Sequence, residues 1–338
     1  MAIEYREWRE GDDLALLEIW GDPETYQARQ FRSSFAVSSA GGNGAPWRRC
    51  IVAEDVLDGV GIPVAAAVVY EAALHPERLW AYIEVAPDHR RAGIGATLIT
   101  MLRREAEQSP SGVAKLRAKV EPGTPGANFA ATFNLAPIQR SRLVVVDPGA
   151  LRLPVFPETD RAGGENAGSD VVMDLATGSV ELTDVVGRYY TAVHDWDSPG
   201  ELSVGQVQRL FLDDLTGAHG AIVLRSQPGS AFGSGVAASR KGRIRAFAVS
   251  YAAQATDADG QPAGNESAPT DVFVGHEPAL EAADAAEAVR DMLSLIAYQH
   301  PLMLELDDAM TALRAAVEPV LTAGTAHVVG SDTWVVSD

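Results

Sequence analysis

The chain has 338 residues, of which 46% are hydrophobic and 22% charged, a balance that suits one large or two ordinary folded domains rather than a disordered chain. Its formal net charge is −19, so its electrostatic field repels polyanions. Nucleic acid and anionic membrane surfaces are therefore not expected as partners.

Strand and helix patterns alternate through the first half. In chain order they predict strand Ile3–Trp8, helices Gly11–Trp20 and Glu24–Phe35, strands Arg49–Glu54, Pro63–Glu71 and Leu79–Val85, helix Gly93–Glu107, strand Val113–Val120, helix Ala127–Phe133 and strand Ile138–Val146. This alternation indicates a mixed α/β (α+β) fold.

The second half repeats this order after a stretch rich in proline, glycine and polar residues, Asp147–Asp170. The predicted elements are helices Leu182–His194 and Val204–Leu215, strands Ala221–Leu224, Ile244–Tyr251 and Val272–Val274, helix Ala279–Tyr298, strand Leu302–Leu306, a helix capped by Asp308 and ending near Leu321, and strand His327–Val336. The repeat indicates a duplicated domain, with domains at 1–150 and 171–338 and a linker at 151–170.

Three features predict a cytoplasmic location. Cys50 is the only cysteine, so no internal disulfide can form. The N-terminal MAIEYREWREGDD lacks the apolar core of a signal peptide. No apolar run approaches the roughly 20 residues needed to span a bilayer.

A glycine-bearing turn, Arg90–Gly95, joins a predicted strand to a predicted helix and carries R-x-x-G-x-G directly after V-x-P. The dinucleotide pattern G-x-G-x-x-G fails, because its third glycine would fall on Leu98. The mononucleotide pattern fails because no lysine lies near. An anion-binding turn or an ordinary strand-to-helix turn remains.

The turn resembles the acyl-CoA pyrophosphate loop of the GNAT superfamily of N-acetyltransferases. The resemblance implies two GNAT-like domains, each a mixed, partly antiparallel twisted sheet flanked by helices. It also implies acetyl-CoA as co-substrate, with its pyrophosphate on the loop and first helical turn: Arg90, Arg91, Ala92, Gly93, Ile94, Gly95 and Ala96. Glycines there let the backbone approach a ligand, and the helix N-terminus favours an anion.

In the family, the preceding strand splays from its neighbour and its free backbone groups bind pantetheine. Here those groups belong to Ile83 and Val85, and an amide near Val85 would hold the oxyanion.

The first half departs from the family at the position of its acidic tyrosine. Many members carry N-x-x-A-x-x-[FL]-Y on the following helix, where this chain has Phe129 and then Ala130. Three alternatives remain open: the acid comes from elsewhere, coenzyme A leaves with solvent help, or the domain is inactive.

The second half departs further, because Gly275–Ala279 contains no R-x-x-G-x-G and no arginine or lysine. We expect this degenerate copy to bind no acyl-CoA, to pack against the first half and to wall the acceptor cleft.

Aminolysis of a thioester needs a base to remove a proton from the amine. Glu84, on the motif strand, is the candidate base, and an arginine-paired carboxylate is the structural alternative. Tyr82, on the same face, is a candidate acid or a packed aromatic residue. Glu121 is a third candidate. No histidine or cysteine spacing indicates a metal site.

These observations predict an acetyl-CoA-dependent N-acetyltransferase that acts by direct attack of a primary amine. Its acceptor would be a small molecule, with a cation favoured by the acidic chain, and the protein could form a homodimer. The alternative is a non-catalytic acyl-CoA-binding sensor or interaction protein.

Overall fold

The computed structural model describes residues 2–23, 26–41, 46–154, 174–175, 179–226, 242–252 and 268–338. They form two compact units. The first contains Met1–Arg140, Trp196–Gly200 and Thr333–Asp338, and the second contains Ser141–Asp195 and Glu201–Asp332. Each unit is described by itself.

These units divide the chain differently from the predicted boundaries at 150 and 171. Ser141–Val146 pairs with a strand of the second unit, while Trp334–Ser337 pairs with a strand of the first. Backbone pairing therefore carries a segment of each half into the other unit. Of the predicted linker, residues 155–170 lie outside the described residues.

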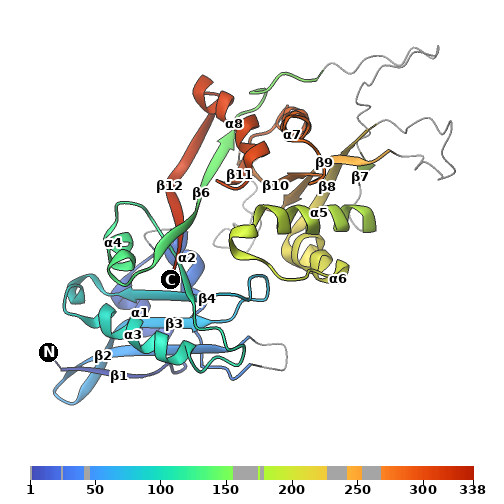
Figure 1. Ribbon diagram of the computed structural model, residues 1–338. Helices are drawn as coiled ribbons and strands as arrows, with labels where there is room; N and C mark the ends of the chain where they lie inside the picture. The colour runs from blue at the N-terminus through green and yellow to red at the C-terminus, as the bar shows by residue number, and fades with distance from the viewer. Residues whose placement is uncertain are drawn as a thin grey trace, which may run out of the picture. The chain divides into compact units, whose positions relative to one another are not determined.

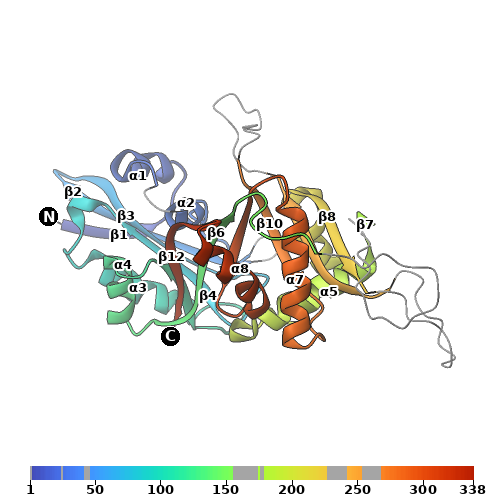
Figure 2. The same ribbon diagram turned by 90° about the horizontal axis from the view of Figure 1, so that it is seen from above.

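The first unit is a twisted sheet with helices on both faces (Figures 1 and 2). Its elements are β1 (Ala2–Glu7), α1 (Asp12–Trp20), α2 (Tyr26–Arg32), β2 (Arg48–Leu57), β3 (Val60–Tyr70), β4 (Leu79–Val85), α3 (Ile94–Ala106), β5 (Leu116–Val120), α4 (Pro125–Thr132), the start of β6 (Ala136–Val146) and the end of β12 (Ala326–Ser337). The strand order is β1–β2–β3–β4–β5–β12, and only the β4–β5 pair is parallel.

The alternating side chains of β3 build two cores. Ala65, Ala67 and Val69 pack with Leu98 and other α3 residues on one face. On the other face, Ala66 and Val68 pack with Leu16 and Trp20 of α1. Both β3 faces are buried, so the unit has a helix layer on each side of its sheet, as Figure 2 shows for α1 and α3.

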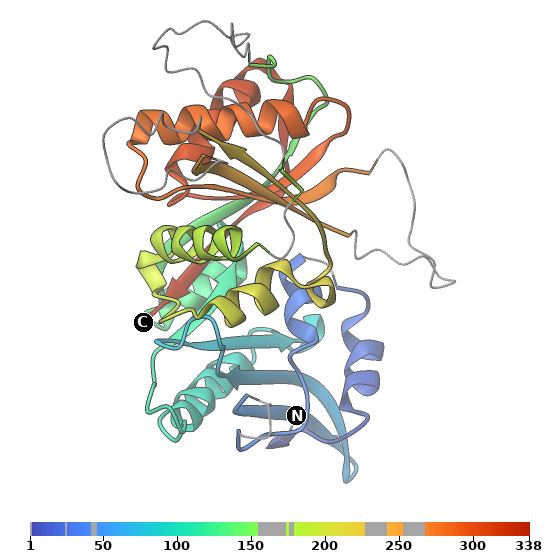
Figure 3. The ribbon, with the colours of Figure 1, turned by 90° about the vertical axis from the view of Figure 1, so that its right-hand side faces the viewer.

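The second unit repeats this arrangement. Its described elements are the end of β6, β7 (Asp174–Leu175), α5 (Val180–Val193), α6 (Val204–Val207), β8 (Ala218–Arg225), β9 (Ile244–Tyr251), β10 (Thr270–His276), α7 (Ala282–Ile296), β11 (Leu302–Asp307), α8 (Thr311–Ala323) and the start of β12. The strand order is β6–β11–β10–β9–β8–β7, with β10 and β11 parallel. Figure 3 shows α7 in orange and α5 in yellow-green on opposite faces of this sheet.

Two local predictions in this unit were wrong. Val204–Leu215 is not one helix: α6 passes into a π-helical turn at Gln208–Leu212, and a separate 3-10 turn follows at Asp214–Thr216. Asp308 does not cap α8, because the residue before its first turn is Met310 and no side chain caps it. Among the described residues, no helix combines the length and apolar character needed to cross a membrane.

Candidate functional site: a splayed strand pair and its phosphate loop

The two parallel strands of the first unit separate along their length. β4 pairs with β5 only at Leu79 and Trp80, although β4 continues to Val85. β5 meanwhile pairs with β12 on its other side, up to Val120. The sheet therefore opens between β4 and β5 beyond Trp80.

Backbone groups of β4 face this opening. The amide of Leu79 donates to the carbonyl of Lys115, just before β5, at 2.8 Å. Residues two apart on a strand direct their backbone groups to the same side. The amides and carbonyls of Ile83 and Val85 consequently point to the β5 side of β4, beyond the last paired residues, Trp80 and Arg117.

The loop after β4 turns sharply into α3. Pro87–His89 forms a 3-10 turn, and both Arg91 (φ 68°) and Gly93 (φ 83°) adopt left-handed angles. Such angles strain a side-chain-bearing residue and suit glycine. The turn brings the chain directly to Ile94, the first residue of α3.

The first turn of α3 offers unpaired amides. The amide of Thr97 donates to the carbonyl of Gly93 at 3.1 Å. The three preceding amides, of Ile94, Gly95 and Ala96, precede the helical bonding pattern and have no acceptor within the helix. With the helix dipole, this geometry suits an anion.

Glycine also avoids a tight contact at the second motif position. A β-carbon on Gly95 would lie 3.3 Å from Cε2 of Phe129 and 4.0 Å from Cγ2 of Val85. A β-carbon on Gly93 would meet nothing within 4 Å, so that position needs glycine for its angle. The loop and its free amides suit an anionic group, and the opening beside β4 leaves backbone groups available to a ligand.

The motif arginines are exposed and differ in position. Nε of Arg90 donates to the carbonyl of Val85 at 3.0 Å. This bond leaves the guanidinium at the end of β4. Arg91 and Ala92 are also exposed, whereas the Ile94 side chain is buried, so Ile94 can serve a ligand only through its backbone.

The other face of β4 carries a partly buried ion pair. Nη2 and Nε of Arg32, from α2, contact the two carboxylate oxygens of Glu84 at 2.6 and 2.9 Å. The hydroxyl of Tyr82 donates to Glu84 Oε2 at 2.8 Å. The arginine-paired alternative for Glu84 is thus the arrangement present.

Aromatic rings enclose this cluster. Phe31 packs on Trp80 and Tyr82, with ring centroids 5.3 and 5.4 Å apart, and Phe35 lies 5.6 Å from Tyr82. Burial and the neighbouring Glu84 carboxylate raise the pKa of Tyr82 above its usual value. Tyr82 is therefore a packed aromatic residue that holds its proton firmly.

The two remaining candidate positions provide no side chain placed for proton transfer. Ala130 belongs to α4, and its methyl group is buried in the core. Glu121 lies just past β5, where its backbone carbonyl accepts from the Thr124 hydroxyl at 2.7 Å.

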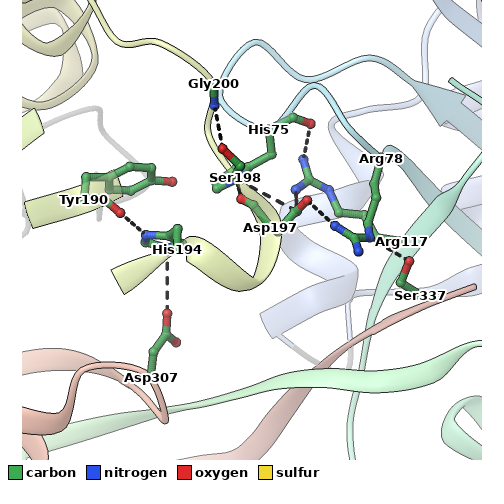
Figure 4. Close-up of polar contacts among 10 residues, drawn as sticks. All are labelled: His75, Arg78, Arg117, Tyr190, His194, Asp197, Ser198, Gly200, Asp307 and Ser337. Atoms are coloured by element: carbon green, nitrogen blue, oxygen red, sulfur yellow. Dashed lines mark hydrogen bonds and ion pairs between the residues drawn. The ribbon is translucent and has the colours of Figure 1, made fainter. Parts of the chain in front are cut away.

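A buried charge cluster lies at the closed end of the strand pair (Figure 4). Asp197, from the segment Trp196–Gly200, is paired with Arg117 of β5 and, at 2.7 Å, with Arg78. Nδ1 of His75 lies 2.6 Å from the Asp197 carbonyl oxygen. The Arg117 guanidinium also lies over the Trp80 ring, 4.1 Å from its centroid. These bonds fix the segment to the first unit.

The second unit keeps the splay but not the loop. β10 pairs with β11 only at Thr270 and Asp271 and continues to His276. At the loop, the Glu277 carboxylate pairs with Arg188 and accepts from the Ala279 amide at 3.2 Å. Side chains also fill the strand end, because a β-carbon on Gly275 would collide with the rings of Phe247 and Tyr189. A carboxylate thus stands at the loop where the first unit presents free amides.

The loop, the splayed strands and the helix that follows define an α/β domain with an anion-binding turn at the end of an open strand. Residues 5–131, which lie within the first unit, match the model of the acetyltransferase (GNAT) family. A GNAT domain supports acyl transfer from acetyl-CoA or another acyl-CoA.

One solved structure extends the likeness in fold to nearly the whole chain. The crystal structure of a GCN5-related N-acetyltransferase from Sphaerobacter thermophilus matches 99% of this chain and 95% of its own, with a TM-score of 0.57 and 12% identity. A tandem GNAT protein from the clavulanic acid biosynthesis pathway covers 100% and 98%, with a TM-score of 0.49 and 15% identity. No curated protein sequence matches the chain. The chain has a two-domain GNAT fold.

Sequence reasoning missed Arg32 and Asp197. Arg32 lies 52 positions from Glu84, and Asp197 lies in the other half of the chain from Arg117. No local spacing joins either pair. The one available signal was Glu84, an acidic residue on a face of β4 that a helix had to cover.

Proposed function

We propose that the protein transfers an acetyl group from acetyl-CoA to the primary amine of a small acceptor. One observation carries the proposal: the β4–β5 opening ends at a loop whose free amides, positive-φ glycine and arginines lie within a GNAT match. The backbone groups of Ile83 and Val85 would hold the pantetheine. Arg90, Arg91 and the amides from Ala92 to Ala96 would hold the pyrophosphate.

The chain supplies orientation and charge to the reaction. Glu84 lies beside the opening and would take a proton from the acceptor amine once the acceptor displaces Arg32 from its carboxylate. The Val85 amide, which faces the opening, would stabilise negative charge on the carbonyl oxygen. No covalent enzyme intermediate is needed.

No tyrosine at position 130 can return a proton to the sulfur, because residue 130 is alanine. Tyr82 is a poor acid because its pKa is raised and its hydroxyl is committed to Glu84. We propose that Tyr82 positions Glu84 and that the thiolate is protonated from solvent.

A second candidate function is a non-catalytic acyl-CoA-binding sensor. Ala130 at the tyrosine position and the Arg32–Glu84 pair favour it. In both cases the second unit would bind no acyl-CoA.

The two functions separate in one experiment. The full chain is incubated with acetyl-CoA and a panel of primary amines, and free thiol is followed. Release of free thiol that depends on an amine supports the transferase. Binding of acetyl-CoA without thiol release on any amine supports the sensor. If Gly93→Asp and the wild type do not differ in acetyl-CoA binding or in thiol release, both proposed functions are overturned. Sedimentation of the same sample tests the proposed homodimer.

A further inference from the structure

The two members of the Arg32–Glu84 pair are anchored independently. Nη1 of Arg32 donates to the Gly21 carbonyl at 2.7 Å, and its guanidinium lies 5.2 Å from the Trp20 ring centroid. Glu84 is held by its place on β4 and by the Tyr82 hydroxyl. Either group would therefore stay in place if a ligand came between them.

Independent anchoring leaves a matched set of binding groups. Nε and Nη2 of Arg32 form a planar fork suited to a carboxylate, while both Glu84 oxygens suit an ammonium group. Both side chains are 14% exposed, so solvent reaches them.

Charge balance limits what can open the pair. A simple cationic amine would take Glu84 and leave the partly buried Arg32 without its carboxylate. A simple anion would bind Arg32 and leave the partly buried Glu84 without its guanidinium partner. Leaving either charge unpaired at low exposure is costly, whereas a ligand that carries both charges replaces both lost contacts. The local site is neutral as a pair, so the chain's net charge of −19 does not by itself select a cation there.

We infer that the acceptor carries a carboxylate as well as its amine, as an amino acid does, with Arg32 binding the carboxylate and Glu84 the amine. This inference rests on the proposed acetyl transfer. The ammonium gives one proton to Glu84, which passes it to solvent. The nitrogen then forms a bond to the acetyl carbon, the carbon–sulfur bond breaks, and the nitrogen gives its second proton to the Glu84 carboxylate. The thiolate takes a proton from solvent.

The test compares matched acceptors on the full chain. Each set contains an amino acid, its methyl ester and the amine without the carboxyl group: phenylalanine with phenethylamine, alanine with ethylamine, and ornithine with putrescine. We expect kcat/KM for at least one amino acid to exceed that of its ester and amine by about tenfold or more. Arg32→Gln should remove that preference, and Arg32→Lys should restore it only in part because lysine lacks the fork.

Arg49→Gln is the matched control, since Arg49 forms its ion pair with Glu105, at 3.5 Å, and not with Glu84. It should keep the preference. The inference is overturned if esters or simple amines serve as well as amino acids, or if Arg32→Gln lowers all acceptors equally.

Absence of thiol release with every amine would contradict the proposed function instead. Calorimetry with the same compounds and coenzyme A then decides the inference. Amino-acid binding that is lost in Arg32→Gln supports it, and no binding, or binding unchanged by the substitution, overturns it.

Discussion

Nε of Arg90 donates to the backbone carbonyl of Val85 at 3.0 Å, so the first arginine of the loop is tied to the last residue of β4. The bond joins the two parts that acetyl-CoA would touch. It uses one donor of the guanidinium and leaves the others available to an anion.

Arg90→Ala should therefore weaken acetyl-CoA binding by about three- to tenfold, because a charge-assisted contact and an anchoring bond are both lost. Calorimetric Kd values measure the effect. Arg104→Ala removes an equal charge from the last turn of α3 and should leave Kd unchanged. An equal loss in both variants would show that only the overall charge matters.

Gly93→Ala should combine a stability cost with a binding cost. A side chain at φ 83° costs roughly 1–2 kcal/mol, and the new methyl group would stand in the loop. Gly112 is a matched control, since its φ is 72° and a β-carbon there also meets nothing within 4 Å. Urea unfolding should show similar losses for both alanine variants, while only Gly93→Ala should raise the Kd for acetyl-CoA.

Asp197→Asn should be strongly destabilising. The Asp197 side chain is fully buried between Arg78 and Arg117, and Arg117 is itself 1% exposed. Removing one partner from a buried ion cluster typically costs about 3–5 kcal/mol. Asp195→Asn, at an exposed neighbouring position, should change the unfolding free energy by less than about 0.5 kcal/mol. A loss below about 1 kcal/mol at Asp197 would show that solvent screens the cluster.

Glu277 should give the second unit a pH-dependent increment of stability. The hydrogen bond from Arg188 lowers the pKa of Glu277 below its ordinary value of 4.5. A lowered folded-state pKa adds stability above pH 4.5, which is lost as the pH falls through the folded value. The Arg188 side chain is 45% exposed and that of Glu277 20%, so solvent screens the pair, and Glu277→Gln should cost only about 0.2–1 kcal/mol at pH 7.

Urea titrations at pH 7 and near pH 3 measure that difference. The gap between wild type and Glu277→Gln should shrink at the lower pH. A gap that stays constant would mean that the Arg188 pair does not contribute.

Acetyl-CoA should bind with a stoichiometry of one per chain. The second loop lacks arginine and lysine, and Glu277 occupies the Ala279 amide. Calorimetry with wild type should give one site, and Gly93→Asp should abolish it. A residual site in that variant would place acyl-CoA binding in the second unit.

Local patterns in the sequence predicted the strands well. The predicted bounds of β4 and β9 equal the observed Leu79–Val85 and Ile244–Tyr251, because apolar alternation and turn residues mark them. The turn from β4 into α3 was also predicted, since Gly93 answers a local need for a positive φ, while the ligand of this turn stays a prediction.

Pairing partners could not be predicted in the same way. A period of two shows which face of a strand is buried but not which strand lies beside it. Nothing in Ile138–Val146 indicated that its end would pair with β11, nor did His327–Val336 indicate a partner in β5. The Arg32–Glu84 pair was hidden for the same reason.

The end of β6 pairs in the second unit and the end of β12 pairs in the first, and this pairing affects how the protein folds during synthesis. During synthesis, β1–β5 leave the ribosome long before Trp334–Ser337, which complete their sheet beside β5. Until then the free edge of β5 needs shielding from other nascent chains. Contacts between segments so distant in sequence also slow folding. We therefore expect the first unit to reach its final form only after the whole second half has been translated.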